Sequence, residues 1–149
     1  MRVLISVDAG HSAEYALREA QTFLKNFPSA TIEVFTVIDM SLIVTGGQET
    51  DQTMIMNELQ QQANSILPIA SQALGPNTFT FSTETGYPVD EILRKIQSFK
   101  ADLLIMGTHG RTGFDHLLIG SVAEKVLRHC ECNTLIISMK KIGGEKEGH

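Results

Sequence analysis

The sequence predicts an α/β fold: a doubly wound, five-stranded parallel sheet with helices on both faces. Short apolar runs alternate along the chain with segments whose apolar residues recur at helical spacing. Four of the five strand-like runs are rich in Val, Ile and Leu, as in strands buried on both faces of a parallel sheet. The 149 residues suffice for one domain, expected over 1–140, and the polar tail 141–149 is predicted to be disordered.

The first strand and helix follow from the residue pattern. RVLISV (Arg2–Val7) is short, apolar and β-branched, and it is bounded by Asp8 and Gly10. Ser12 is placed to cap the next helix, which Pro28 is expected to end. The inward face of this helix is predicted from the spacing of Ala13, Ala16, Leu17, Ala20, Leu24 and Phe27.

The middle of the chain predicts a strand, a loop and a long helical segment. TIEVFTVI (Thr31–Ile38) is the second strand, and the stretch 39–50 has no clear period and is predicted to be a loop. A helical pattern then covers 55–74. Because a proline inside a helix removes a hydrogen bond at a cost of about 3 kcal/mol, Pro68 predicts a kink or a break near Leu67.

The second half of the chain also predicts strands that alternate with helices. TFTFSTE (Thr78–Glu84) alternates like a strand near a sheet edge, and Pro88 suits the first position of the next helix. ADLLIMG (Ala101–Gly107) is the fourth strand, a helix is predicted from about Ser121 to Cys130, and TLIISMK (Thr134–Lys140) is the last strand. The predicted inward residues are Val89, Ile92, Leu93 and Ile96 in the first of these helices and Ala123, Val126, Leu127 and Cys130 in the second.

Charge and composition argue against several classes of protein. Nucleic-acid binding rests on clustered Lys and Arg, whereas this chain has a net charge of -5 and scattered basic residues. No apolar run approaches the length of a membrane-spanning helix, and a strand that begins at Arg2 leaves no room for a cleavable signal. We therefore expect a cytoplasmic protein that binds neither nucleic acid nor membranes.

The two cysteines are too few and too close in sequence for a disulfide framework. With His129 they form the sequence HCEC, which suggests a metal site. A structural zinc site, however, needs four ligands, and the sequence has no second cluster. We favour a packing role, with Cys130 facing the core and Cys132 in a turn.

The loop after the fourth strand, GTHGRTGFDHLLIGS (Gly107–Ser121), predicts an anion site. Doubly wound sheets bind ligands at the carboxyl ends of their strands, where this loop begins and where Asp8 also lies. Glycines let backbone N–H groups converge on an anion, and a helix that starts at Gly120 offers further N–H groups and a favourable dipole. His109 or Arg111 could supply charge. We interpret the loop as a polyphosphate cradle built mainly from backbone.

The loop allows other interpretations. A glycine-rich loop can be a flexible turn, and neither a P-loop motif nor a GxGxxG after the first strand is present. A flavodoxin-like protein needs a Ser/Thr-rich loop after the first strand, which DAGHS does not supply. A phosphoacceptor receiver domain needs an aspartate at the end of the third strand, where Glu84 stands.

The spacing of the loop resembles a known family. Gly107, Gly110, Gly120 and Ser121 match G-x2-G-x9-G-S, the ATP-binding motif of the universal stress protein family. VLISVDAGHSAEYAL, EVFTVID, GYPVDEILRKIQSFKADLLIMGTHGRTG and GSVAEKVLRHCECNTLIIS are similar to other segments of that family. The resemblance implies strand order 3-2-1-4-5, an adenine nucleotide alpha hydrolase-like fold, and bound ATP, AMP or ADP, with or without Mg²⁺.

The same resemblance implies roles for individual residues. Asp8 would contact the adenosine moiety and the Val37 backbone the adenine edge, while Ser6 and Val7 would line the base pocket. The other implied binding residues are Met106, Gly107, Thr108, His109, Gly110, Arg111, Thr112, Gly113, Gly120, Ser121 and Val122.

These observations favour a regulatory nucleotide-binding protein over an enzyme. Hydrolysis would need an oriented water, a base and usually Mg²⁺, and Asp115 and His116 are the only nearby candidates. We expect slow ATP hydrolysis or self-phosphorylation at most, and no catalytic residue is assigned. The apolar last strand leaves a sheet edge that pairing would protect, and family members commonly form dimers through it. A homodimer through Thr134–Lys140 is therefore expected, and a dimeric stress-response interaction module without nucleotide is the main alternative.

Overall fold

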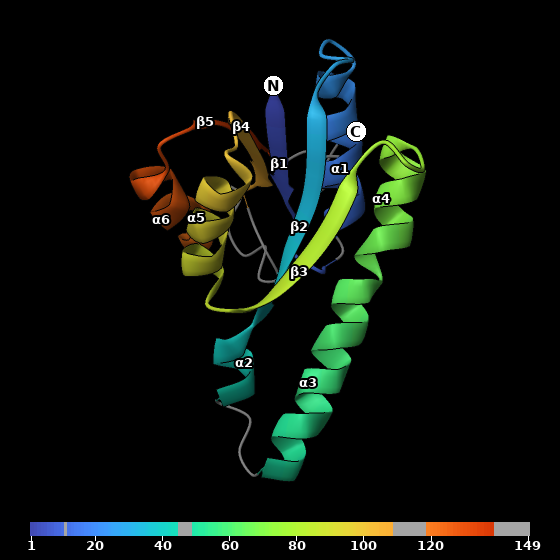
Figure 1. Cartoon of the computed structure of the whole chain (residues 1–149). Helices are drawn as coiled ribbons and strands as arrows, with labels where there is room; N and C mark the ends of the chain where they lie inside the picture. Colours follow the sequence, from blue (N-terminus) through green and yellow to red (C-terminus); the bar gives the residue numbers. More distant parts are fainter. Residues whose placement is uncertain (11, 45–48, 109–118, 139–149) are drawn as a thin grey trace, which may run out of the picture.

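Five parallel strands form the centre of the molecule, in the order β3-β2-β1-β4-β5 (Figure 1). The computed structural model describes residues 1–10, 12–44, 49–108 and 119–138. The fold class and the strand order expected from the sequence are confirmed. The strands are β1 (Arg2–Ser6), β2 (Thr31–Asp39), β3 (Thr80–Gly86), β4 (Leu103–Gly107) and β5 (Asn133–Ile137).

The register of the central strands aligns their carboxyl ends. Ile5 of β1 lies between Val34 of β2 and Ile105 of β4, and all three side chains are fully buried. One residue further along, Ser6 pairs with Met106. The ends of β1, β2 and β4 therefore meet at one edge of the sheet, and a core of apolar side chains fixes their positions.

Two pairs of helices cover the sheet (Figure 1). On one face α1 (Ala13–Leu24) and α4 (Ile66–Leu74) pack against a core cluster that includes Ile5 and Val34. On the other face α5 (Pro88–Phe99) and α6 (Ser121–His129) pack against a second cluster that includes Phe35. Two further helices, α2 (Met40–Val44) and α3 (Glu49–Asn64), connect β2 to α4.

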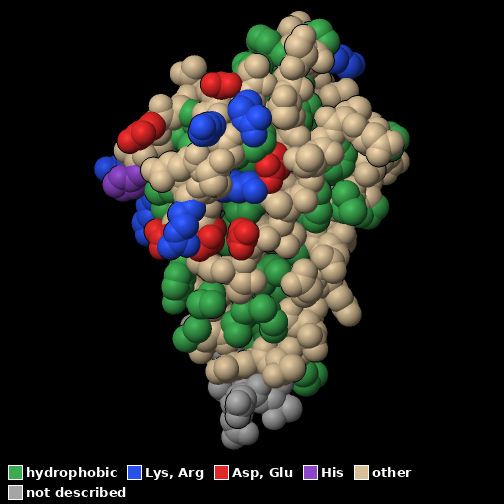
Figure 2. All heavy atoms as spheres, viewed as in Figure 1, with side chains coloured by type: hydrophobic (Ala, Val, Ile, Leu, Met, Phe, Trp, Pro, Cys, Tyr) green, Lys and Arg blue, Asp and Glu red, His purple; other side chains and the backbone are tan. Residues whose placement is uncertain are grey.

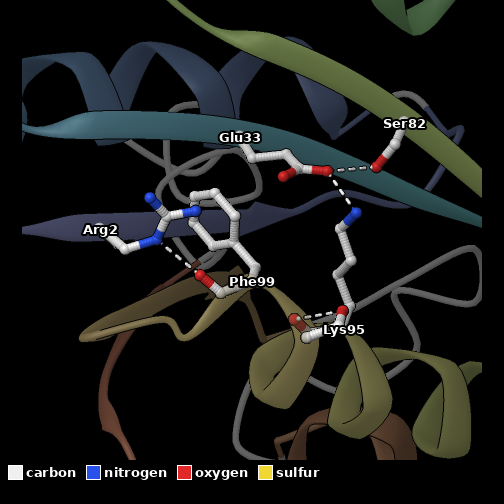
Figure 3. A network of polar contacts seen from close by, with 6 residues as sticks. Arg2, Glu33, Ser82, Lys95 and Phe99 are labelled. Atoms are coloured by element: carbon white, nitrogen blue, oxygen red, sulfur yellow. Dashed lines mark hydrogen bonds and ion pairs between the residues drawn. The ribbon is translucent and has the colours of Figure 1, made fainter.

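Polar contacts hold α5 against the sheet (Figure 3). Lys95 of α5 forms an ion pair with Glu33 of β2, with 2.5 Å between Nζ and Oε1, and the hydroxyl of Ser82 donates to the same oxygen at 2.6 Å. At the carboxyl end of α5, four residues after Lys95, the carbonyl of Phe99 accepts a hydrogen bond from the Nε of Arg2 at 2.6 Å, and the Arg2 guanidinium lies over the Phe99 ring. These contacts join β1, β2, β3 and α5.

The predicted loop over 39–50 is wrong, because it contains α2 and the start of α3. Asp39 explains the local turn: its carboxylate accepts hydrogen bonds from the backbone N–H of Ser41 at 2.9 Å and from the Ser41 hydroxyl at 2.6 Å. None of the α2 residues is buried. Without a buried face the segment carries no apolar period, which is why the pattern did not predict a helix.

The predicted break near Leu67 is confirmed. The helix α3 ends at Asn64 and α4 begins at Ile66. Pro68 occupies the third position of α4, where a backbone N–H has no intrahelical acceptor in any case. Its ring would clash with the carbonyl of Asn64, four residues earlier, if the helix were continuous.

Two predicted details of α1 are wrong. Ser12 makes no side-chain cap hydrogen bond, since its backbone already has helical angles. The helix ends at Leu24, before Pro28, and Phe27 lies beyond it with 40% of its surface exposed. Phe27 instead packs on the ring of Phe23, with 5.2 Å between centroids.

Other boundaries also differ from the sequence prediction. The third strand begins at Thr80 because Thr78 closes the end of α4, where its hydroxyl donates to the carbonyls of Leu74 and Gly75. In α6, Leu127 is not an inward residue: 36% of its surface is exposed, and Cys130 is only partly buried. The last strand ends at Ile137, and residues 139–149, including the predicted tail, lie outside the described residues. None of the described helices is long and apolar enough to cross a membrane.

Candidate functional site

A hollow of about 280 Å³ opens at the edge of the sheet where β1, β2 and β4 end. It combines strand ends with the first residues of α1, α5 and α6. This is the position at which doubly wound sheets bind ligands. The lining residues are Ser6, Val7, Asp8, Ser12, Ala13, Ala16, Val37, Asp39, Leu42, Pro88, Ile92, Met106, Gly107, Thr108, Gly120, Ser121, Val122 and Ala123.

Every predicted binding residue that the structure describes lines this hollow. These residues are Ser6, Val7, Asp8, Val37, Met106, Gly107, Thr108, Gly120, Ser121 and Val122. The other predicted binding residues, His109, Gly110, Arg111, Thr112 and Gly113, lie outside the described residues, as do Asp115 and His116. The structure thus brings together residues up to 116 positions apart in the sequence, from Ser6 to Val122, and their contact with a ligand stays a prediction.

The floor of the hollow is apolar and firmly held. Val7 and Met106 are 5% and 6% exposed, and Ser6 is 8% exposed. The backbone N–H of Val7 donates to the carbonyl of Phe35 at 3.0 Å, which extends the β1–β2 ladder to the rim. Val37 adds a further apolar side chain from β2. A flat apolar group could bind here without displacing the strands.

The two ends of the loop after β4 are held together. The backbone N–H of Gly120 donates to the carbonyl of Thr108 at 2.5 Å, and the N–H of Thr108 donates to the carbonyl of Ile137 at 3.1 Å. These bonds tie the start of α6 to the ends of β4 and β5. The first turn of α6 is therefore fixed beside the strand ends.

The amino end of α6 faces the hollow. Gly120 precedes the helix and provides no side-chain cap, and Glu124 is the first residue whose N–H bonds back to Gly120, at 2.9 Å. The amides of Ser121, Val122 and Ala123 have no acceptor within the helix, and all three residues line the hollow. These N–H groups and the positive end of the helix dipole favour an anion, and the Ser121 hydroxyl is a further donor.

The charged side chains of the hollow suit a part of a ligand other than a phosphate. Its described lining includes the carboxylates of Asp8 and Asp39, and no Lys, Arg or His. Carboxylates accept hydrogen bonds from hydroxyl and amino groups and repel phosphate. Among the described residues, anion binding would therefore depend on backbone amides at α6, while Asp8 suits an uncharged hydroxyl.

The sequence reasoning missed part of the lining. Asp39 and Leu42 were placed in a structureless loop, and Pro88 was assigned only to start a helix. Asp39 ends β2 and Pro88 follows the end of β3, so applying the strand-end rule to β2 and β3 as well as to β1 and β4 could have found these two residues. The other missed lining residues are Ser12, Ala13, Ala16, Ile92 and Ala123.

Within the described part of the chain, no group of three or more His, Cys, Asp or Glu side chains is placed to hold a metal ion. Cys130 and Cys132 are partly buried beside the α5–α6 core, and both are free thiols. The two cysteines do not contribute to the hollow.

Comparison with known proteins gives a consistent family match. The model of the universal stress protein family matches residues 1–138. The universal stress protein MJ0531 of Methanocaldococcus jannaschii is 29% identical over 144 residues, which cover 94% of this chain and 83% of that protein.

Solved structures agree with the observed fold. The structure of the hypothetical protein MJ0577 is 27% identical, has a TM-score of 0.74, and the match covers 91% of this chain and 94% of that one. A universal stress protein in complex with cAMP is 22% identical, with a TM-score of 0.57 over 92% of this chain and 95% of that one. The universal stress protein of Archaeoglobus fulgidus in complex with dAMP is 16% identical, with a TM-score of 0.59 over 92% and 97% of the two chains.

Proposed function

The chain belongs to the universal stress protein family, and we propose that the hollow at the carboxyl edge of its sheet binds an adenine nucleotide. The observation that carries this proposal is the amino end of α6, whose first amides have no acceptor within the helix and belong to residues that line the same hollow as the apolar strand ends. Complexes of family members with cAMP and dAMP support it, because both ligands join an adenine base to a phosphate.

The proposed ligand lies across the strand ends. The adenine packs on the apolar floor formed by Val7, Val37 and Met106. The ribose hydroxyls lie near Asp8, and the phosphates meet the amides that follow Gly120. In this proposal the predicted loop residues His109, Gly110, Arg111, Thr112 and Gly113 complete the phosphate site. ATP, ADP and AMP share all of these features, and Mg²⁺ would accompany the longer phosphate chains.

The nucleotide would act as a regulatory signal. Carboxylates at the hollow oppose phosphate instead of activating it, so we propose a sensor with slow hydrolysis or self-phosphorylation at most. We also propose that the protein works as a homodimer in the cytoplasm. The dimer contact is assigned to β5, which pairs with β4 alone among the described strands and so leaves one side as a sheet edge.

Calorimetric titration tests the nucleotide proposal. AMP, ADP and ATP, each with and without Mg²⁺, should bind with one site per chain, and adenosine should bind more weakly because it cannot use the α6 amides. Ser121→Ala should weaken AMP binding about tenfold, since a hydrogen bond to a charged group is worth about 1.5 kcal/mol or more. Gly120→Val should abolish binding, because a branched side chain crowds the approach of the phosphate.

Matched variants separate binding from folding. Gly120 has φ -57°, which any residue adopts, so Gly120→Val should keep the native circular dichroism spectrum. Ser98→Ala removes an exposed serine of α5 and should bind AMP like the parent chain. If the folded parent binds none of the nucleotides, the protein is instead an interaction module of the same fold. Light scattering at micromolar concentration tests the dimer separately.

A further inference from the structure

A pair of thiols lies at the opposite end of α6 from the hollow. Cys130 follows the last residue of the helix, and Cys132 lies in a bend just before β5. Their sulfur atoms are 3.3 Å apart. A disulfide bond is about 2.05 Å long, so the two sulfurs need to approach by little more than 1 Å to bond.

The thiol pair is reachable from solvent. A second hollow, of about 250 Å³, is lined by both cysteines, His129 and Glu131, and on the α5 side by Gln97 and Lys100. This volume is several times the ~30 Å³ that a water molecule occupies. The hollow therefore has room for a small polar oxidant beside the two cysteines.

We propose that Cys130 and Cys132 are a modification site at which a hydroperoxide converts the two thiols into an intrachain disulfide. Neither cysteine lines the nucleotide hollow, and neither belongs to β5. The proposal therefore does not depend on nucleotide binding.

The reaction balances in two steps. The thiolate of one cysteine attacks an oxygen of hydrogen peroxide, the O–O bond breaks, and a sulfenic acid forms while hydroxide leaves and takes up a proton as water. The second thiol then attacks the sulfenic sulfur, the S–O bond breaks, and the departing hydroxide takes the thiol proton as a second water. Both sulfurs are oxidised, and one peroxide is reduced.

The surroundings of the pair set the order of attack. Burial raises the pKa of the Cys132 thiol to about 12, and its hydrogen bond with Cys130 adds to the rise. Cys132 is therefore the poorer first nucleophile. We assign the first attack to Cys130 and the resolving attack to Cys132, where the short distance compensates for weak ionisation.

Thr134 lies beside the thiol pair, and the disulfide formed there should be reversible. The hydroxyl of Thr134, the second residue of β5, lies 3.5 Å from the sulfur of Cys130 and 3.4 Å from the carbonyl of Cys132, and it can donate to either. The disulfide would close a very short loop, which removes little entropy from the unfolded chain. A disulfide that gains so little stability is readily reduced, and a dithiol reductant should reopen this one.

Mass spectrometry of the full chain tests the site. Reduced protein is treated with hydrogen peroxide, alkylated and cut with trypsin, which releases both cysteines in the peptide of residues 129–140. We expect a peptide lighter by two hydrogen atoms that no longer takes up alkylating reagent and that recovers both thiols after reduction. Met139 in the same peptide can only add oxygen, so the two reactions are distinguishable by mass.

Two single variants test the order of attack. With Cys132→Ser the chain cannot close the bond, and Cys130 should accumulate as a sulfenic acid that dimedone traps. With Cys130→Ser the remaining Cys132 should react at least about tenfold more slowly, because burial, the main cause of its raised pKa, persists. The proposal is overturned if both parent thiols remain titratable under peroxide that oxidises the methionines, or if the only products carry added oxygen or join two chains.

Discussion

The layered body of the molecule buries its large apolar residues, whereas the arm that projects from it leaves similar residues exposed. We define the arm as α2 together with residues 49–56 of α3; Figure 1 shows both extending beyond the end of the sheet. In the body, Leu4 and Leu104 are fully buried. In the arm, Val44 and Met54 are 62% and 66% exposed. Figure 2 shows hydrophobic side chains on the surface of this lower part of the molecule.

The difference shows how burial and sequence pattern are linked. The body has two large core clusters, one on each face of the sheet. The arm joins the body through a third cluster whose buried members are only Ile38, Leu59 and Ala63. Where a face is buried, apolar residues are required at a fixed spacing, so the sequence shows a period. Where nothing is buried, that requirement disappears.

The largest expected effect comes from the centre of the body. Leu104→Ala should lower the free energy of unfolding by about 3 to 4 kcal/mol, because the cavity lies between the sheet and the helices α5 and α6, where the paired strands limit collapse. Urea denaturation followed by circular dichroism measures the change. A loss below about 1 kcal/mol would mean that the body is not the rigid part of the molecule.

A leucine-to-alanine substitution where the arm joins the body should lower the free energy of unfolding by less than Leu104→Ala does. Leu59→Ala also truncates a buried leucine, 6% exposed, but its cluster is small and its neighbours can move into the space. We expect a loss of about 2 kcal/mol in the same assay. Equal losses for Leu59→Ala and Leu104→Ala would remove the distinction between junction and body.

An intermediate effect is expected from the ion pair between β2 and α5. Glu33 is 8% exposed, and its carboxylate bonds both Lys95 and Ser82. Glu33→Gln leaves the Lys95 charge without its partner in a largely buried place and should cost about 1 to 2 kcal/mol. The double variant Glu33→Gln, Lys95→Met should recover part of that loss. Additive losses in the double variant would show that the pair is not coupled.

The smallest effect is expected in the arm itself. Met54 is 66% exposed, so Met54→Ala should change the free energy of unfolding by no more than about 0.5 kcal/mol. The urea midpoint and slope should both match those of the parent chain. A loss as large as that of Leu59→Ala would indicate that the arm is packed against something in solution.

The same comparison explains which elements the sequence could predict. The buried parallel strands and the break before Pro68 follow from apolar period and proline chemistry, which act locally or through the core. The strand order, in contrast, was implied only by the resemblance to the family. The helix α2 was missed because its stability depends on the carboxylate of Asp39 and not on a buried face. The start of β3 was misplaced because the Thr78 hydroxyl caps α4, a contact that propensity does not reveal.

The residues of the candidate site also divide into those that the sequence could predict and those that it could not. Asp8, the start of the loop after β4 and the start of α6 could be predicted, because strand ends and glycine spacing carry the signal. Ser6, Val7 and Met106 were implied only by the resemblance to the family. Leu42 could not, since it belongs to the arm and reaches the hollow only through the position of α2. The hollow is thus lined by both regions, with most of its surface from the rigid body.

The most direct test of the nucleotide site is an amide map of the chain in solution. In ¹⁵N-labelled protein, AMP should shift the amide signals of Ser121, Val122 and Ala123 more than any others in the described chain, because the phosphate meets those N–H groups. Adenosine should shift the signals of Val7 and Val37 and leave those at the start of α6 nearly unchanged. If AMP and adenosine shift the same signals equally, or if neither shifts the start of α6, the α6 amides do not hold a phosphate and the account is contradicted.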